Sequence, residues 1–319
     1  MNTTSNVSYA IDTWYDRTLL ERANPNILHH LFGMVKDLPK RGSNRVKFRK
    51  YGAFANNTTP LTEGVTPAGK DLSVTDVYAT VRQYGDFVML SDFLLDTSLE
   101  DAMMEASEVL GEQAGNSLDE VMRETLVAGT SVRYAGGQVS RGAISSSHKL
   151  SDDLLRLFIL DLKDANAPRI TKMVNPSEGY DTTPVDATYV AIVSPRTTYN
   201  LKKNVTNFVP IEKYFAQTEK LPGEVGKFEE LRFIESTQAK TFTGEGSGGV
   251  DVACMLAFGA RAYGVSRLSG EALKNIRKGV GSAGSTDPLD QRATSAWKAT
   301  LGLVITQQLF MNRLEFYNE

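Results

Sequence analysis

The sequence predicts an α+β fold, and three observations predict it. Residues 45–90 contain two stretches in which apolar and polar residues alternate, which is the period of β-strands. Residues 98–128 carry apolar residues at steps of three and four, which is the period of a helix. Shorter segments of both kinds follow toward the carboxyl end. This order, a ribbon, a long helix and then mixed elements, is typical of an α+β protein.

Composition indicates a folded and nearly neutral chain. Of 319 residues, 41% are hydrophobic, which is enough for one large core or two modest ones. The 35 basic and 38 acidic residues give a formal net charge of −3, so the chain as a whole is not expected to bind nucleic acid tightly. The single cysteine, Cys254, lies in an apolar run and indicates a buried thiol of a reducing compartment. Without a signal peptide pattern or an apolar span of about 20 residues, we expect a soluble cytoplasmic product with no membrane contact.

Residues 1–44 are predicted to form an amino-terminal arm. Their short apolar patches are interrupted by Pro25 and Pro39 and are too few for a core, so the arm needs another surface. Seven basic residues and one acidic residue lie between Lys36 and Lys50. This run predicts contact with phosphate or with an acidic neighbour, and an ordinary solvated face explains it equally well.

Residues 45–90 are predicted to form a projecting β-ribbon. Its two strands are separated by a breaker-rich tip, 52–71, which is longer than an ordinary hairpin loop. The breakers are Pro60, Gly64, Pro67 and Gly69. Because a two-stranded ribbon is marginally stable in water, we expect it to pack on another subunit.

The strongest helix in the sequence is predicted at 98–128. Ser98 and Asp101 suit its amino-terminal cap, and Gly129 suits its end. At 1.5 Å per residue it would be roughly 45 Å long. Gly111 and Gly115 predict a bend or a close neighbour. Its predicted core face comprises Leu99, Met103, Ala106, Leu110, Ala114, Leu118 and Val121.

The remaining elements are shorter. A second helix is expected at 151–165, a buried strand at 188–193, and a helix that Ser194-Pro195 opens and that runs to about Lys203. Further strands are expected at 231–235, 250–258 and 261–268. Residues 297–317 fit a strand better than a helix.

Nothing in the sequence predicts catalysis or a cofactor. The adjacent His29 and His30 cannot easily share one metal ion, and neither they nor His148 belong to a ligand cluster, so no zinc site is expected. Two segments, 244–249 and 279–284, match GxGxxG. Neither has the preceding strand and following helix that a dinucleotide site requires, so both are interpreted as loops.

Several motifs together resemble the N4-like major capsid proteins of tailed bacteriophages and prophages. The resemblance runs over nearly the whole chain, and the string at 60–67 is its most specific part. The motifs are Asp12–Leu20, Leu38-Pro39-Lys40, Val46-Lys47-Phe48-Arg49, Pro60-Leu61-Thr62-Glu63-Gly64-Val65-Thr66-Pro67, Gln83-Tyr84-Gly85, Leu90-Ser91-Asp92, Leu110-Gly111-Glu112-Gln113-Ala114, Leu118-Asp119, Asp287–Arg292 and Trp297-Lys298.

The resemblance implies a Hong-Kong-97-like fold and a division of the chain. It implies an arm at 1–44, an extended loop at 45–90, a peripheral domain at 91–185 with the spine helix at 98–128, a mainly axial domain at 186–285, and a return to the peripheral and axial core at 286–319. Contacts between subunits are expected from the ribbon at Lys47, Arg49, Leu61, Thr62, Glu63, Gly64 and Pro67.

The same resemblance implies a function without covalent chemistry. Copies of the chain would form hexamers and pentamers of an icosahedral shell around double-stranded DNA, assembled in the bacterial cytoplasm and retained in the virion. The implied partners are further copies of the chain, a portal, a separate scaffolding protein, a decoration protein and the packaged DNA through non-specific contact. Two alternatives stay open: a cellular nanocompartment (encapsulin-like) shell protein, and a nucleotide-binding enzyme.

Overall fold

A computed structural model describes most of the chain. The described residues are 19, 27–39, 43–52, 54–61, 63–98, 101–174, 182–214, 221–267, 273–282 and 284–319. Most of the predicted arm, including the motif at 12–20 apart from Leu19, lies outside them, as does Thr62. No helix in these ranges is both long enough and apolar enough to span a membrane.

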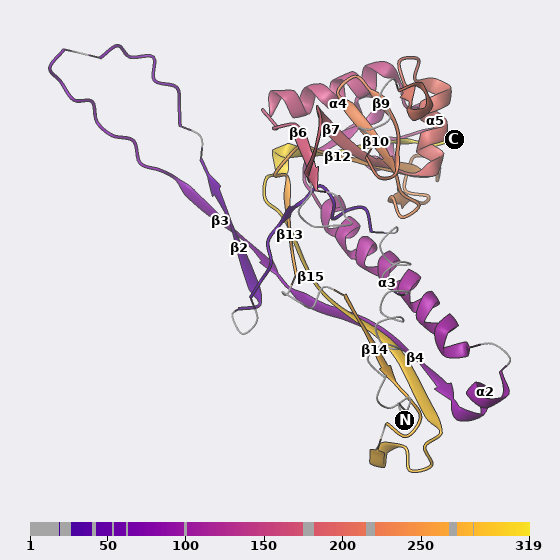
Figure 1. Ribbon diagram of the computed structural model, residues 1–319. Coiled ribbons are helices and arrows are strands. Elements are labelled where there is room, and N and C mark those ends of the chain that lie inside the picture. Colours follow the sequence, from indigo (N-terminus) through magenta and orange to yellow (C-terminus); the bar gives the residue numbers. More distant parts are fainter. Residues whose placement is uncertain are drawn as a thin grey trace.

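A nine-stranded mixed sheet forms the upper part of the molecule in Figure 1. Its main path, from edge to edge, is β5 (Val132–Tyr134), β16 (Met311–Tyr317), β12 (Val252–Phe258), β7 (Thr182–Val193), β10 (Leu231–Glu235), β9 (Glu224–Phe228) and β8 (Val209–Pro210). Two strands branch from it: β6 (Ile170–Val174) pairs with β7, and β11 (Thr241–Phe242) pairs with β12.

Both faces of this sheet are covered. Alternate residues of β12 belong to two different cores: Ala253, Met255 and Ala257 pack with helix α4 (Asp152–Asp164), whereas Cys254 and Leu256 pack with helix α3 (Ala102–Val127). The strict alternation is the period of two expected of a strand buried on both faces. Helix α5 (Pro195–Asn204) begins at Ser194, whose hydroxyl accepts the N–H of Thr197, with Pro195 in the first turn.

The second sheet is built around one long strand, β15 (Arg292–Ile305). Its first ten residues pair with β4 (Arg82–Ser91) on one edge, while β14 (Leu273–Lys278) pairs with the other edge of the same stretch. Its last four residues pair with β13 (Tyr263–Ser266). A short strand, β1 (Met34–Val35), extends β13. Short 3₁₀ turns complete the fold: η3 (Ala135–Gly137), η4 (Arg141–Ala143), η5 (Ile211–Lys213), η7 (Gly284–Thr286) and η8 (Gln308–Phe310).

Helix α3 crosses the molecule between the two sheets (Figure 1). It begins four residues later than predicted, because helix α2 (Asp92–Thr97) precedes it and Ser98 caps the carboxyl end of α2. The cap of α3 is Asp101, whose carboxylate accepts the N–H groups of Met103 and Met104 at 3.1 Å. Both predicted helical glycines are buried. The core face includes polar residues that periodicity did not indicate, namely Ser107, Asp119 and Arg123, whereas Ala106 and Val121 are half-buried.

Strands β2 (Arg45–Tyr51) and β3 (Val74–Thr80) form the predicted ribbon, which projects from the body (Figure 1). Its root is anchored by a small core of Leu38, Val46, Phe48 and Ala79. Phe48 lies against Gly264 of β13, where an added Cβ would be 2.6 Å from the ring. The prediction that all of 45–90 projects is wrong for residues 82–90, since β4 pairs along its whole length with β15 of the same chain.

Asp119 joins the part of the predicted arm at residues 28–29 to helix α3. Its Oδ1 accepts the backbone N–H groups of Leu28 and His29 at 2.9 Å, and its Oδ2 lies 2.7 Å from Nδ1 of His29. Both side chains are fully buried. Tyr263 donates its hydroxyl hydrogen to the carbonyl oxygen of His29 at 2.6 Å, so residues 28–29 are bonded to α3 and β13 together. The buried carboxylate of Asp119 therefore has its hydrogen-bonding capacity satisfied. Removing this carboxylate would leave the donors of Leu28 and His29 without a partner.

We therefore expect Asp119→Ala to lower the free energy of unfolding by at least about 3 kcal/mol, because three buried donors lose their acceptor. Denaturant unfolding followed by circular dichroism measures this. The matched control is Glu112→Ala on the exposed side of α3, which should change stability by less than about 0.5 kcal/mol. Equal stability of the two variants would contradict the assigned role of Asp119.

Candidate interaction surfaces

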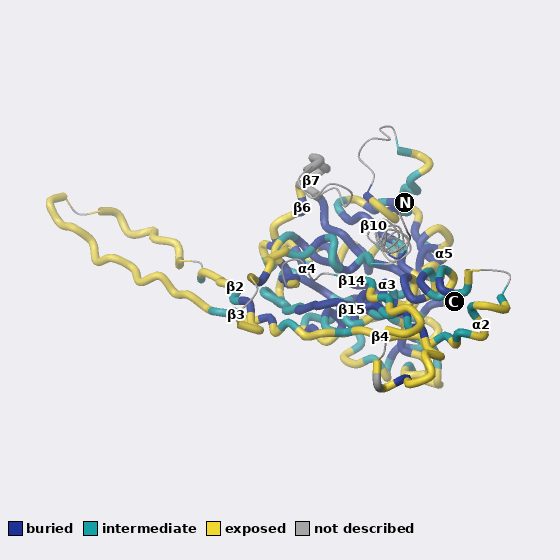
Figure 2. Tube along the Cα trace, turned by 60° about the horizontal axis from the view of Figure 1, so that its bottom comes forward, coloured by how far each residue is buried: buried dark blue, intermediate teal, exposed yellow. Residues whose placement is uncertain are grey.

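The tip of the ribbon comprises residues 52–73, and its described residues, 52, 54–61 and 63–73, are almost all solvent-exposed in the chain on its own (Figure 2). Among the predicted contact residues, Leu61 is 74% exposed, Glu63 and Pro67 are exposed, and Gly64 has a φ of 75° that favours glycine. The tip also exposes Phe54, Val65 and Leu72. Apolar side chains concentrated on a projecting loop indicate a surface that another molecule covers.

The predicted contact residues at the root differ from those at the tip. Lys47 forms an ion pair with Asp76 on the neighbouring strand, and this hydrogen bond raises the pKa of Lys47. Arg49 lies 3.5 Å from the same carboxylate. Lys47 and Arg49 thus already have an acidic partner within their own ribbon.

A shallow groove of about 750 Å³ lies on the face of β4, β15 and β14 that points away from α3. Phe87, Ala296 and Ile276 form one cross-strand row of this face, and Met89 lies in the next row. Phe87 and Met89 are each 58% exposed. The opposite face is covered, because Ser295 and Trp297 are buried and hydrogen-bond to α3 residues Ser107 and Gln113.

Basic residues surround this apolar row. Lys278 lies in the row of Met89, and Lys298 and Lys274 lie in the row of Gly85. Sequence reasoning missed this face because β14 and β4 are far apart in the chain and meet only through β15. Strand β14 itself was not predicted, since its sequence contains only two apolar residues among six.

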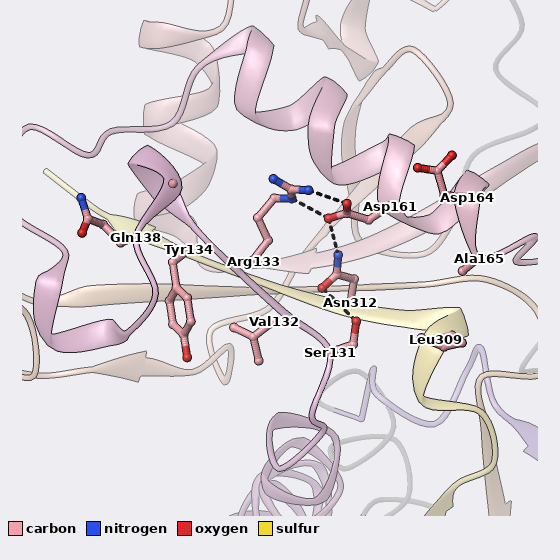
Figure 3. Close-up of a pocket in the computed structure, with 11 residues that line it drawn as sticks. Ser131, Val132, Arg133, Tyr134, Gln138, Asp161, Asp164, Ala165, Leu309 and Asn312 are labelled. Atoms are coloured by element: carbon pink, nitrogen blue, oxygen red, sulfur yellow. Dashed lines mark hydrogen bonds and ion pairs between the residues drawn. The ribbon is translucent and has the colours of Figure 1, made fainter.

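A third surface is a pocket of about 480 Å³ beside the edge strand β5 (Figure 3). Its floor is a hydrogen-bonded network in which Arg133 donates two hydrogen bonds of 2.5 Å to Asp161 and Asn312 donates one of 3.0 Å to the same carboxylate. The Arg133–Asp161 pair raises the pKa of Arg133, mainly through those hydrogen bonds. Charges neutralised in this way offer neither a general base nor a free cation to a substrate.

The glycine motifs and histidines that were considered as candidate ligand sites lie in structural settings within the described residues. The first GxGxxG segment lies between β11 and β12, and the second lies between β14 and β15 and is followed by a 3₁₀ turn instead of a helix. His29 is bonded to Asp119 as described above, and burial lowers the pKa of His30. No three His, Cys, Asp or Glu side chains of the described residues are arranged to hold a metal ion.

Comparison with known proteins gives structural similarity only. No protein-family model matches the sequence, and no curated protein is significantly similar to it. The capsid of Ralstonia phage GP4 matches with a TM-score of 0.70 at 13% identity, covering 92% of both chains. The chain has the Hong-Kong-97-like fold of phage capsid subunits. The head protein of Helicobacter pylori bacteriophage KHP40 matches with a TM-score of 0.63 at 12% identity, covering 92% of this chain and 90% of the other.

A more distant match extends the fold beyond phage capsids. The virus-like particle of Pyrococcus furiosus matches with a TM-score of 0.52 at 11% identity, covering 95% of this chain and 99% of that one. The fold class predicted from the sequence is thus confirmed.

Cys254 on β12 is buried, and this burial raises the pKa of its thiol to about 12. At pH 8 the thiolate fraction would then be on the order of one in ten thousand. We expect a thiol reagent to label the native protein negligibly at pH 8 and completely in denaturant, as mass spectrometry would measure. Fast labelling without denaturant would mean that β12 is accessible.

Proposed function

We propose that this protein is the major capsid protein of a tailed phage or prophage of the N4-like family. Copies of it assemble into hexamers and pentamers of an icosahedral shell that encloses double-stranded DNA. The observation that carries the proposal is the projecting tip, whose exposed apolar residues cannot reach the body of their own chain (Figure 1). The similarity in fold to phage capsids supports the same conclusion.

The contact residues of the proposal are those of the ribbon. Leu61, Glu63, Gly64 and Pro67 touch a neighbouring subunit, together with Thr62, which lies outside the described residues. Lys47 and Arg49 lie at the root and contribute through their pair with Asp76. Fully burying a leucine side chain contributes about 1.5–3 kcal/mol, so a few such residues give a modest contact. Closure of the shell makes modest contacts sufficient, because each subunit is held by several others.

The face that receives the tip is the groove on β4, β15 and β14. It combines the apolar row of Phe87, Ala296 and Ile276 with surrounding lysines and with two acidic lining residues, Asp86 and Asp287. The tip combines apolar residues with Glu63, Lys70 and Asp71, which together carry a charge of −1. Apolar surfaces of opposite charge are complementary. The tip and this face lie at opposite ends of the molecule in Figure 1, so the contact requires a second copy.

The proposal includes the division of the chain into an arm (1–44), an extended loop (45–90, of which 45–80 project), a peripheral domain (91–185), a mainly axial domain (186–285) and a return segment (286–319). Partners are a portal, a separate scaffolding protein, a decoration protein and the packaged DNA. The near-neutral charge supports weak, non-specific DNA contact. Assembly takes place in the bacterial cytoplasm, and the protein has no catalytic activity or cofactor.

A cellular nanocompartment shell is the alternative within the same fold. The virus-like particle of Pyrococcus furiosus has a lower TM-score than the phage GP4 capsid, 0.52 against 0.70, which favours the phage assignment. A nucleotide-binding enzyme is disfavoured by the loop setting of both glycine motifs. Genes for a terminase and a portal beside this one would support the phage capsid, and a cargo enzyme gene would support the compartment.

Replacing residues 52–73 by Asn-Gly is expected to abolish shells and leave the subunit folded. Tyr51 and Val74 are paired in β2 and β3, so a two-residue turn can join them. Negative-stain electron microscopy of the recombinant protein measures assembly, and thermal unfolding measures the fold. The control is Asn56→Ala in the exposed tip. Shells from the shortened variant would contradict the proposed role of the tip.

The double substitution Phe87→Ser and Met89→Ser is expected to reduce assembly and to change the free energy of unfolding by less than about 1 kcal/mol, because both side chains are already exposed. The matched control is Val109→Ser, an equally exposed apolar residue on α3. Sedimentation separates shells from free subunits. If the control lowers assembly as much as the double variant, the groove is not the receiving face.

A further inference from the structure

The pocket beside β5 has an aliphatic rim around its polar floor. Asp161 and Asp164 line it from α4, and Leu157 and Leu160 lie on the same face of that helix at steps of three and four. Both leucines are exposed, as is Leu309, another lining residue, at 59%. Val139 follows the lining residue Gln138 and is 90% exposed. Leu309 thus lines the pocket itself, and Leu157, Leu160 and Val139 lie on the segments that contribute other lining residues. Exposed aliphatic residues gathered in this way are typical of an interface.

The opposite edge of the same sheet carries a second half-buried apolar segment. Strand β8 is the last strand on the main path and pairs with β9 through Val209 and Pro210. Ile211 follows them in η5, and all three are partly exposed. The path from β5 to β8 contains seven strands. Its six steps of about 4.8 Å place the two edges roughly 29 Å apart. The two surfaces are therefore different in composition and lie on opposite sides of one domain.

We infer that, in the rings of the shell, the pocket beside β5 of one copy receives the β8–η5 edge of the next copy. This inference rests on the proposed function and identifies the contact that closes the ring. Two different patches on opposite edges of a subunit generate a head-to-tail contact, and such contacts close into rings when the rotation between copies permits. A patch that paired with itself would give only a two-fold dimer.

The charges of the two surfaces are complementary. In the pocket the Arg133–Asp161 pair is neutral, but Asp164 is exposed and forms no ion pair or hydrogen bond with the described residues (Figure 3). On the other edge, Lys213 of η5 is exposed and likewise forms no ion pair with them. Bringing Lys213 to Asp164 supplies each charge with a partner and fixes the direction of the ring.

The contact is made by side chains and not by continuing the sheet from copy to copy. Strand β5 has only three residues, and Pro210 of β8 has no N–H to donate to a neighbouring strand. Val209 and Ile211 thus serve as apolar residues that cover the leucines of the rim.

Cysteine crosslinking tests this contact in assembled full-length protein. Leu160→Cys and Ile211→Cys are introduced together and singly, and assembled particles are treated with a short bismaleimide. The native Cys254 is buried and remains unlabelled. The double variant should give a ladder of covalent oligomers on a denaturing gel, whereas each single variant should remain monomeric. The double variant carrying Asp153→Cys in place of Leu160→Cys is the control, because Asp153 is exposed at the start of α4.

A charge exchange supplies an independent readout. Asp164→Lys and Lys213→Asp should each lower the yield of assembled particles several-fold, and the two together should restore it. The inference would be overturned if particles assembled but gave no ladder, or if Leu160→Cys alone gave one. It would also be overturned if the charge exchange did not restore assembly. Each of these outcomes would leave the proposed function intact. If the unmodified chain formed neither rings nor shells, the proposed function itself would fail.

Discussion

Strand β15 holds the lower half of the molecule together. It is paired with β4 along one edge and with β14 along the other, and its last residues pair with β13. Helix α3 packs across it through Ser295 and Trp297. A strand whose backbone N–H and C=O groups are hydrogen-bonded along both edges, and whose one face is buried, is rigid. The ribbon is attached to this unit through Val304 at its root, so the position of the tip relative to the body is fixed by β15.

Because only its root is anchored, the ribbon has two parts that differ in what stabilises them. At the root, Val46 and Phe48 are buried and Lys47 is paired, so the chain stabilises it without help. Beyond Tyr51 the backbone has neither an apolar core nor regular structure of its own in the described residues. A loop of this length that stays exposed costs conformational entropy to order, and a partner surface must offset that cost. The ribbon thus has a folded base and an exposed end, and the proposed shell would supply the partner surface for that end.

Local patterns predicted most of the elements. Alternation predicted β2 and β3, helical spacing predicted α3 and α4, and Ser194-Pro195 predicted α5. The buried polar residues were not predictable, because their partners are distant in the chain: Asp119 bonds to His29 from 90 residues away, and Glu315 is buried between Arg313 and Arg141, which lies 174 residues away. The sequence predicted the tip, as a long loop rich in proline and glycine. Its receiving groove and the β5 pocket were not predicted, since each combines segments that only the folded sheets bring together.

The two proposed contacts lie at different places on the subunit and impose different requirements. In the proposed shell the tip would reach over a neighbour and add a long-range link, whereas the edges of the nine-stranded sheet would meet side by side and set the direction of the ring. With both contacts in use, each copy would bind its neighbours at four sites: its tip, its groove, its β5 pocket and its β8–η5 edge. If one of these contacts broke, the other three would still hold the copy. A shell built in this way can form from weak and reversible steps, which lets misplaced subunits leave before closure.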